Sequence, residues 1–173
     1  MPLYEFEGKA PSVHPSAFVA PTASLVGDVT IEENASVWYG VVLRADFGPV
    51  VIRAGANVQD NSVLHGGPEG CTVGPGATIG HLCVVHGATV GAEAVIGNNA
   101  TIQDGAVIGA RTLIAAGATV PPNTQVDSEV VLLGAAAKRQ LPLTEGARKW
   151  VDGNPKIYQE LARRHRDGSA PVD

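Results

Sequence analysis

Aliphatic residues recur every six positions over most of the chain, with small or polar residues between them. The longest unbroken run holds seven members: Val84, Val90, Ile96, Ile102, Ile108, Ile114 and Val120. An earlier run with the same spacing holds Val13, Val19, Leu25, Ile31, Val37 and Leu43, and the spacing resumes in Ile52, Val58 and Leu64 and again in Val73 and Ile79. A period of six matches neither the 3.6-residue period of an amphipathic helix nor the alternation of an ordinary strand. The pattern therefore predicts a repeat architecture.

A triangular prism accounts for this period. Each hexapeptide supplies one short strand and one turn, and three hexapeptides complete a coil whose aliphatic side chains point inward. Coils stack at about 4.8 Å, and each buries its apolar face against its neighbours. We expect an all-β solenoid, a left-handed parallel β-helix, with roughly six coils between Val13 and Val126. A right-handed β-helix would vary more in coil length, and a disordered Gly-rich tract would not keep the register.

The repeat ends after Gly134, and helical signals follow. A first helix is predicted over 145–151, ended by Asp152-Gly153. A second begins at Asn154, because Asn followed by Pro155 reads as an N-cap with Pro at the first helical position. Ile157, Tyr158, Leu161, Ala162 and His165 share one face of it. We divide the chain into a lead-in (1–12), the β-helix (13–134), a C-terminal α-helical segment on the prism flank (135–166) and a disordered tail (167–173).

Composition agrees with many short strands and tight turns. Aromatic residues make up 5% of the chain, against 21 Gly and 12 Pro. The net charge of −5, without a basic face, argues against nucleic acid, and the lack of a long apolar stretch argues against a membrane span. The N-terminus lacks the features of a signal peptide, and Cys71 and Cys83 fit reduced thiols. These features predict a cytoplasmic protein.

Two breaks in the repeat are more informative than the repeat itself. Leu43 to Ile52 and Leu64 to Val73 each span nine residues instead of six, so two successive coils have 21 residues instead of 18. Insertions on a repeat scaffold usually form loops on one edge, often the functional one. We therefore expect loops at both breaks.

The 21-residue spacing predicts two columns of polar side chains. Arg44, His65 and His86 stack on one face, pointing outward because each follows an inward aliphatic residue. Asp60 and His81 are also 21 apart and stack on another face. One prism cannot bring the columns together, but three prisms in a ring can. The spacing thus predicts a homotrimer with a three-histidine metal site and a cross-chain Arg44–Asp60 pair at each interface.

Five motifs resemble the γ-class carbonic anhydrase family, in order and over nearly the whole chain. They are Leu43-Arg44-Ala45-Asp46, Asn57-Val58-Gln59-Asp60-Asn61, Leu64-His65-Gly66, Ile79-Gly80-His81 and Val85-His86-Gly87. The resemblance implies a trimer of left-handed β-helices with Zn²⁺, or Co²⁺ or Fe²⁺, between subunits. His65 and His86 would be ligands from one chain, and His81 the ligand from its neighbour. The implied reaction is attack of a metal-bound hydroxide on CO2 to give bicarbonate.

The resemblance also implies roles for other residues. Gln59 would orient the metal-bound water, Arg44 and Asp60 would bridge subunits with Asp46 supporting Arg44, and Tyr158 would lie close to the metal. Two features depart from the best-studied members of the family. Phe47 stands where they carry a glutamate, and the short loop from His65 to Cys71 holds only Glu69 as an acidic candidate for proton transfer.

Other functions remain open at this stage. A non-catalytic or differently tasked member of the family, such as an assembly or binding protein or a thioesterase-like hydrolase, would keep the same metal site. A hexapeptide acyltransferase would use one histidine as a general base and would not need three clustered histidines. The three histidines could also be polar interface residues that bind nothing. For His14 and His165 we expect structural roles.

Overall fold

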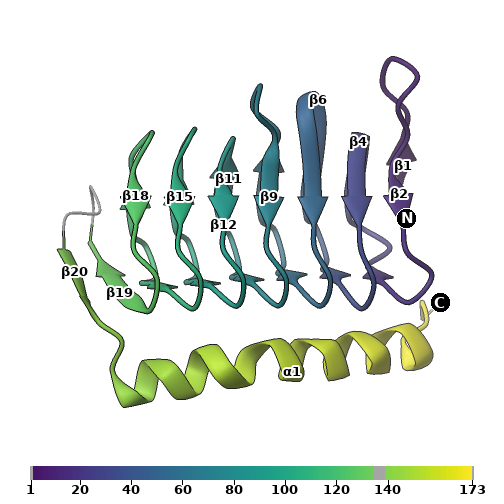
Figure 1. Ribbon diagram of the computed structural model, residues 1–173. Helices are drawn as coiled ribbons and strands as arrows, with labels where there is room; N and C mark the ends of the chain where they lie inside the picture. The colour runs from purple at the N-terminus through teal and green to yellow at the C-terminus, as the bar shows by residue number, and fades with distance from the viewer. Residues whose placement is uncertain (1, 135–138, 173) are drawn as a thin grey trace.

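The computed structural model describes residues 2–134 and 139–172, and the repeat region forms a left-handed parallel β-helix (Figure 1). The predicted fold class is confirmed. Along the second sheet, seven parallel strands mark seven coils. Six of them lie between Val13 and Val126 as expected, and the seventh is the strand Val130–Leu133 beyond that range.

The strands belong to two sheets. The first holds β1 Leu3–Tyr4, β2 Ser12–Val13, β4 Ser24–Ile31, β6 Val42–Ile52, β8 Val63–His65, β9 Cys71–Val73, β11 Val84–His86, β12 Thr89–Val90, β14 Thr101–Ile102, β15 Val107–Ile108, β17 Thr119–Val120 and β18 Gln125–Val126. The second holds β3 Phe18–Val19, β5 Ser36–Val37, β7 Asn57–Val58, β10 Thr78–Ile79, β13 Val95–Ile96, β16 Leu113–Ile114, β19 Val130–Leu133 and β20 Arg139–Pro142. β20 is antiparallel to β19, and β6 joins two faces of the prism by pairing with both β8 and β9.

With one exception, the aliphatic residues of the repeat form one continuous core inside the prism. The exception is Val84, which is 40% exposed, and Val85 points inward in its place. Leu25, Leu43, Leu64, Ile79 and Ile96 are all fully buried. Cys71 and Cys83 lie in the same core and form no disulfide. Burial raises the pKa of Cys71 to about 12 and that of Cys83 to about 11, so both thiols stay protonated near neutral pH.

The first break does not form a loop outside the ladder, as the insertion rule predicted. Residues 42–52 are one strand, β6, and β4 pairs with it through a register shift. Ala45 pairs with Gly27 and Val50 with Val29, so residues 46–49 bulge out opposite a single residue. The bulge keeps both ends of the strand in the ladder. At the second break, an isolated antiparallel bridge joins Gly67 to Gly70.

A single helix, α1 Glu145–Gly168, runs back along the prism flank (Figure 1), so the prediction of two helices was wrong. Thr144 caps it by accepting a hydrogen bond from the Ala147 N–H. Gly153 and Pro155 lie inside the helix. Tertiary packing overrides these local signals, because Val151 and Pro155 are buried against the prism.

Two clusters and an ion network hold α1 in place. Phe18, Ala20, Trp38 and Ala162 form one cluster, and Val95, Leu143 and Val151 form the other. Arg111 of the prism lies 2.7 Å from both Glu93 and Asp152, and these carboxylates raise its pKa. Ile157, expected on the buried face, is 51% exposed. The helix also continues two residues beyond the predicted boundary at 166, while residues 135–138 of the predicted segment lie outside the described residues.

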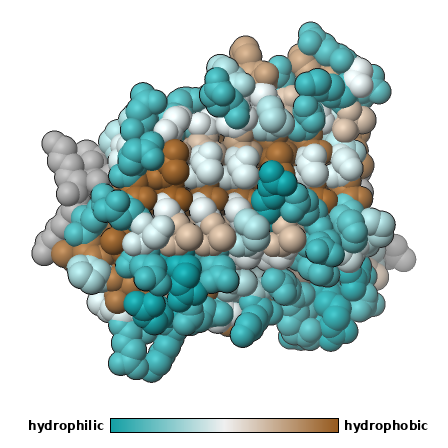
Figure 2. Space-filling view, viewed as in Figure 1, coloured by the Kyte–Doolittle hydropathy of each residue, from teal (hydrophilic) through white to brown (hydrophobic). Residues whose placement is uncertain are grey.

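On the face that Figure 2 shows, hydrophilic residues gather over α1 and at the projecting rim of the prism. Figure 2 shows these hydrophilic regions on either side of a band of apolar and small residues. In residues 2–134 and 139–172, no helix combines the length and the apolar character needed to cross a membrane.

Shortening a side chain should lower the free energy of unfolding far more inside the stacked core than on the surface. Ile96→Ala removes a fully buried side chain, and we expect the free energy of unfolding to fall by about 2–5 kcal/mol. Val107→Ala, at a position 38% exposed, serves as the control and should change it by less than about 0.5 kcal/mol. Urea unfolding followed by circular dichroism measures both. Equal midpoints for the two variants would contradict the assigned core.

Candidate metal centre

The first predicted column is present on the face formed by β6, β8 and β11. Arg44 is in register with His65, and His65 with His86, on adjacent strands. The His65 side chain is 10% exposed and that of His86 is 38% exposed. The Gly87 N–H donates to the His65 carbonyl at 3.0 Å, and this hydrogen bond holds the two strands in register. The 21-residue spacing therefore places the two imidazoles one rung apart.

The two imidazoles meet edge to face. His65 Nδ1 lies 2.8 Å from His86 Nε2, and the ring centroids are 4.7 Å apart. Zinc binds histidine nitrogens at about 2.0–2.1 Å. A small separation of the rings is therefore enough for one divalent cation to bind both nitrogens.

Each ring has a carboxylate on its other nitrogen. Asp46 Oδ1 lies 2.6 Å from His65 Nε2, and Asp104 Oδ1 lies 2.7 Å from His86 Nδ1. The hydrogen bond from His65 lowers the pKa of Asp46, outweighing the effect of burial, and Arg44 lowers it further. An ionised carboxylate only accepts hydrogen bonds, so both outer ring nitrogens carry the proton.

This arrangement leaves two acceptors facing each other. In neutral imidazoles protonated on the outer nitrogens, the inner nitrogens, Nδ1 of His65 and Nε2 of His86, both carry lone pairs. Lone pairs 2.8 Å apart repel unless a proton or a metal cation lies between them. Carboxylates on the outer nitrogens are also the usual support of metal-binding histidines. The donor set therefore fits a divalent transition metal such as zinc.

The second column lies at another corner of the prism, after β7 and β10. The Leu82 N–H donates to the Asp60 carbonyl, and His81 Nδ1 lies 3.0 Å from Asp60 Oδ2. The side chain of His81 is 41% exposed. In the described ranges, no three His, Cys, Asp or Glu side chains of one chain converge on a metal-sized site. His81 therefore repeats the carboxylate-supported pattern but does not join the other two histidines within one chain.

The other residues predicted for the site lie in the two columns or on the neighbouring helix α1. Arg44 forms an ion pair with Asp46 of its own chain. Gln59 is 4% exposed, and its Nε2 donates to Asn57 Oδ1 at 3.1 Å. Tyr158 of α1 packs edge to face on Trp38, with a centroid distance of 5.6 Å. Burial, and then the charge of Asp60, raises the pKa of Tyr158, so its hydroxyl stays protonated at neutral pH.

Glu69, the acidic candidate for proton transfer, and Phe47, which replaces the family's glutamate, are both exposed. Glu69 is exposed beside the Gly67–Gly70 bridge. Phe47 is 76% exposed at the bulge of β6, and its ring centroid lies 5.8 Å from that of His65. An apolar ring therefore stands beside His65, where the resembled family carries a carboxylate.

The sequence reasoning missed Asp104. It follows His86 by 18 residues, the length of an ordinary coil. The strands pair Val85 with Ile102, so Asp104 lies one position past the residue in register with His86 and reaches it through its side chain. Applying the coil period beyond the last histidine would have found it.

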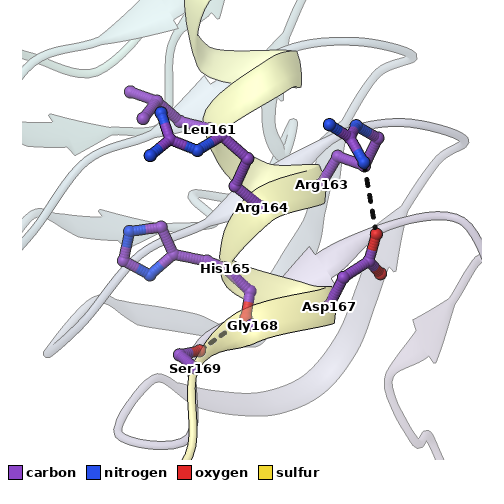
Figure 3. A pocket seen from close by; sticks show the side chains of 7 residues that line it. All are labelled: Leu161, Arg163, Arg164, His165, Asp167, Gly168 and Ser169. Atoms are coloured by element: carbon purple, nitrogen blue, oxygen red, sulfur yellow. Dashed lines mark hydrogen bonds and ion pairs between the residues drawn. The ribbon is translucent and has the colours of Figure 1, made fainter.

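The other two histidines contact polar and aromatic neighbours. His14 Nδ1 lies 2.8 Å from the Ser16 hydroxyl. His165 Nδ1 lies 3.2 Å from the Tyr39 hydroxyl, and its ring packs on Trp38 at 4.9 Å. Figure 3 shows His165 among the residues around a surface hollow at the end of α1, where Arg163 pairs with Asp167.

Comparisons with known proteins agree with this architecture. The family described as "Bacterial transferase hexapeptide (six repeats)" matches residues 87–122. The carnitine operon protein CaiE of Salmonella typhimurium is 40% identical over 171 residues, which are 97% of this chain and 85% of that protein.

Two solved structures are similar over nearly their whole length. A hexapeptide transferase family protein from Anaplasma phagocytophilum is 35% identical with a TM-score of 0.89, covering 94% of this chain and 96% of that one. A putative acetyltransferase from Bacillus cereus is 30% identical with a TM-score of 0.93, covering 96% and 98%. The sequence, the coil geometry and these similarities together show that the chain belongs to the family of hexapeptide-repeat proteins that includes CaiE.

Proposed function

We propose that the chain forms a homotrimer that holds one divalent metal at each subunit interface and catalyses the reversible hydration of CO2 to bicarbonate. The observation that carries this proposal is the pair of facing nitrogens of His65 and His86, 2.8 Å apart, each ring held by a carboxylate on its far side. A pair arranged in this way is stabilised by a cation between the rings.

His65 and His86 of one chain and His81 of a neighbour would hold the metal. Zn²⁺ is the first candidate, with Co²⁺ and Fe²⁺ as alternatives suited to imidazole ligands. Such a cation lowers the pKa of a coordinated water to near neutrality and so supplies the nucleophile. Three protein ligands leave a position open, as catalytic sites require.

The surrounding residues orient the reactants. Asn57 fixes the amide plane of Gln59, which is buried and therefore cannot turn freely toward solvent. Asp60 holds the His81 ring through Nδ1 and leaves Nε2 to face a neighbouring chain. Arg44, positioned by Asp46, lies on the face that would meet the Asp60 column of the next subunit.

Acyl transfer is the competing enzymatic function, because the similar solved structures are named as a transferase family protein and a putative acetyltransferase. One histidine base is enough for that reaction. It gives no reason for two imidazoles to face each other. A binding or assembly role, or hydrolysis, at the same metal site is the other alternative and is consistent with the name of the carnitine operon protein.

Metal content tests the shared site. We expect the purified trimer to hold about one divalent cation per chain, and His81→Ala to lose it while the prism stays folded. His14→Ala, at an exposed histidine outside both columns, should keep it. Elemental analysis and light scattering measure cation and assembly. A monomer, or a His81→Ala variant with full metal, would contradict the shared site.

Asp104 tests the role of the outer carboxylates. Replacing it with Asn keeps the shape but weakens the hydrogen bond to His86 Nδ1, so we expect metal affinity to fall about 10–100-fold. Asp127→Asn is the matched control, since Asp127 is exposed and lies outside the histidine columns. Competition with a chelator of known affinity gives both constants. Equal affinities for the two variants would show that Asp104 does not support a ligand.

Stopped-flow measurement of CO2 hydration tests the reaction. Zinc, cobalt and iron(II) forms should be compared without oxygen, and at least one should exceed the metal-free rate. Gln59→Ala should lower kcat/KM roughly 10²-fold, because the attacking water loses its orientation. If none of the three metals supports hydration, the proposed reaction is wrong, and acetyl-CoA-dependent transfer is then the assay to run on the same samples.

A further inference from the structure

A cavity of about 160 Å³ lies between the prism and α1, beside His81. Gln59, His81 and Asn98 line it from the prism. Trp150, Asn154 and Tyr158 line it from the helix. The cavity thus lies between the second column and the helix.

The three helix residues form a single row. They are spaced four apart, so they lie one above another on the same helix face. Trp150 is 54% exposed, Tyr158 is half-buried and Asn154 is 1% exposed. The row therefore lines the cavity with an exposed indole, a buried amide and a half-buried phenol.

Asn154 carries an unused acceptor. Its Nδ2 donates to Thr78 Oγ1 at 2.7 Å, and Asn57 Nδ2 donates to the same hydroxyl at 2.8 Å. In the part of the chain that the structure describes, Asn154 Oδ1 is the one buried side-chain nitrogen or oxygen atom without a hydrogen-bond partner. A buried acceptor left unpaired is unfavourable by about 1–3 kcal/mol. An N–H or O–H group of a ligand would relieve it.

The size and charge of the cavity restrict that ligand. Liquid water occupies about 30 Å³ per molecule, so a space of about 160 Å³ exceeds what the three atoms of CO2 need. His81 is the only ionisable side chain of the lining besides Tyr158, and Asp60 already holds its Nδ1. The Tyr158 hydroxyl is a donor at neutral pH, suited to a carbonyl oxygen.

We propose that this cavity binds an uncharged carbonyl compound larger than CO2, whose N–H or O–H group donates to Asn154 Oδ1. The inference rests on the proposed function for its link to catalysis, because His81 lines the cavity and would also be a metal ligand. Uncharged carbonyl compounds would then be a second substrate class for the site that contains His81. Binding itself uses residues of one chain and does not require the metal.

A matched pair of probes tests the missing donor. N-methylacetamide and methyl acetate have the same number of heavy atoms, but only the amide carries an N–H. Titrations followed by ligand-observed NMR, on the whole assembled protein, should give a dissociation constant at least about 10-fold lower for the amide. Equal affinities, or no binding of either probe, would overturn the proposal.

Single substitutions test whether Asn154 causes the difference in affinity between the two probes. Asn154→Leu removes the acceptor and should abolish the difference between the probes. Ile157→Ala, on the exposed side of the same helix, should preserve it. Trp150→Ala, which alters an exposed side chain and so leaves the fold intact, should weaken both probes equally. A difference that persists in Asn154→Leu, or effects of Trp150→Ala no larger than those of Ile157→Ala, would refute the assignment.

Repeating the titration after chelation separates this inference from the proposed function. Amide binding should survive metal removal. Absence of CO2 hydration by the metal-loaded protein, with amide binding intact, would count against the proposed reaction alone. Metal binding and hydration without selective amide binding would count against the cavity alone.

Discussion

The hydrogen bonds between stacked coils are the constraint on which the rest of the structure depends. Each strand pairs with the strand one coil away, and the inward aliphatic residues hold that register. A slip by one residue would turn a column of Leu, Ile and Val outward. Because the register is fixed, any side chain is placed directly above the residue one coil earlier. The columns of the candidate site are a consequence of this stacking, and the bulge of β6 adds Asp46 beside His65.

Hydrogen bonds to carboxylates then determine which nitrogens of the first column carry protons. Asp46 and Asp104 lie at the two ends of a row that contains His65 and His86. The carboxylates draw the ring protons outward, and the inner nitrogens are left facing each other. A β-helix surface would tolerate isolated histidines without consequence. Here a carboxylate binds the outer nitrogen of each ring, so the inner nitrogens are placed to share a cation. Isolated surface histidines lack this arrangement.

The helix contributes a second set of groups that the repeat alone could not supply. Its burial against the prism holds a continuous helix through Gly153 and Pro155, and it presents Trp150, Asn154 and Tyr158 to the His81 side. The prism thus provides the histidines and carboxylates, whereas the helix closes a cavity beside one of them. This division fits a family in which one scaffold serves several reactions.

The sequence by itself determined the coil period, the inward residues except at Val84, where Val85 is buried instead, and the two columns. A six-residue period and a 21-residue coil translate directly into stacking. The sequence also carried the resemblance from which the metal ligands were expected. Only the tertiary structure decided the single helix, the strand that continues through residues 46–49 and the unpaired Asn154 Oδ1. These features depend on packing between segments far apart in the chain. Local signals at Gly153 and Pro155 favour a break there, and burial against the prism outweighs them.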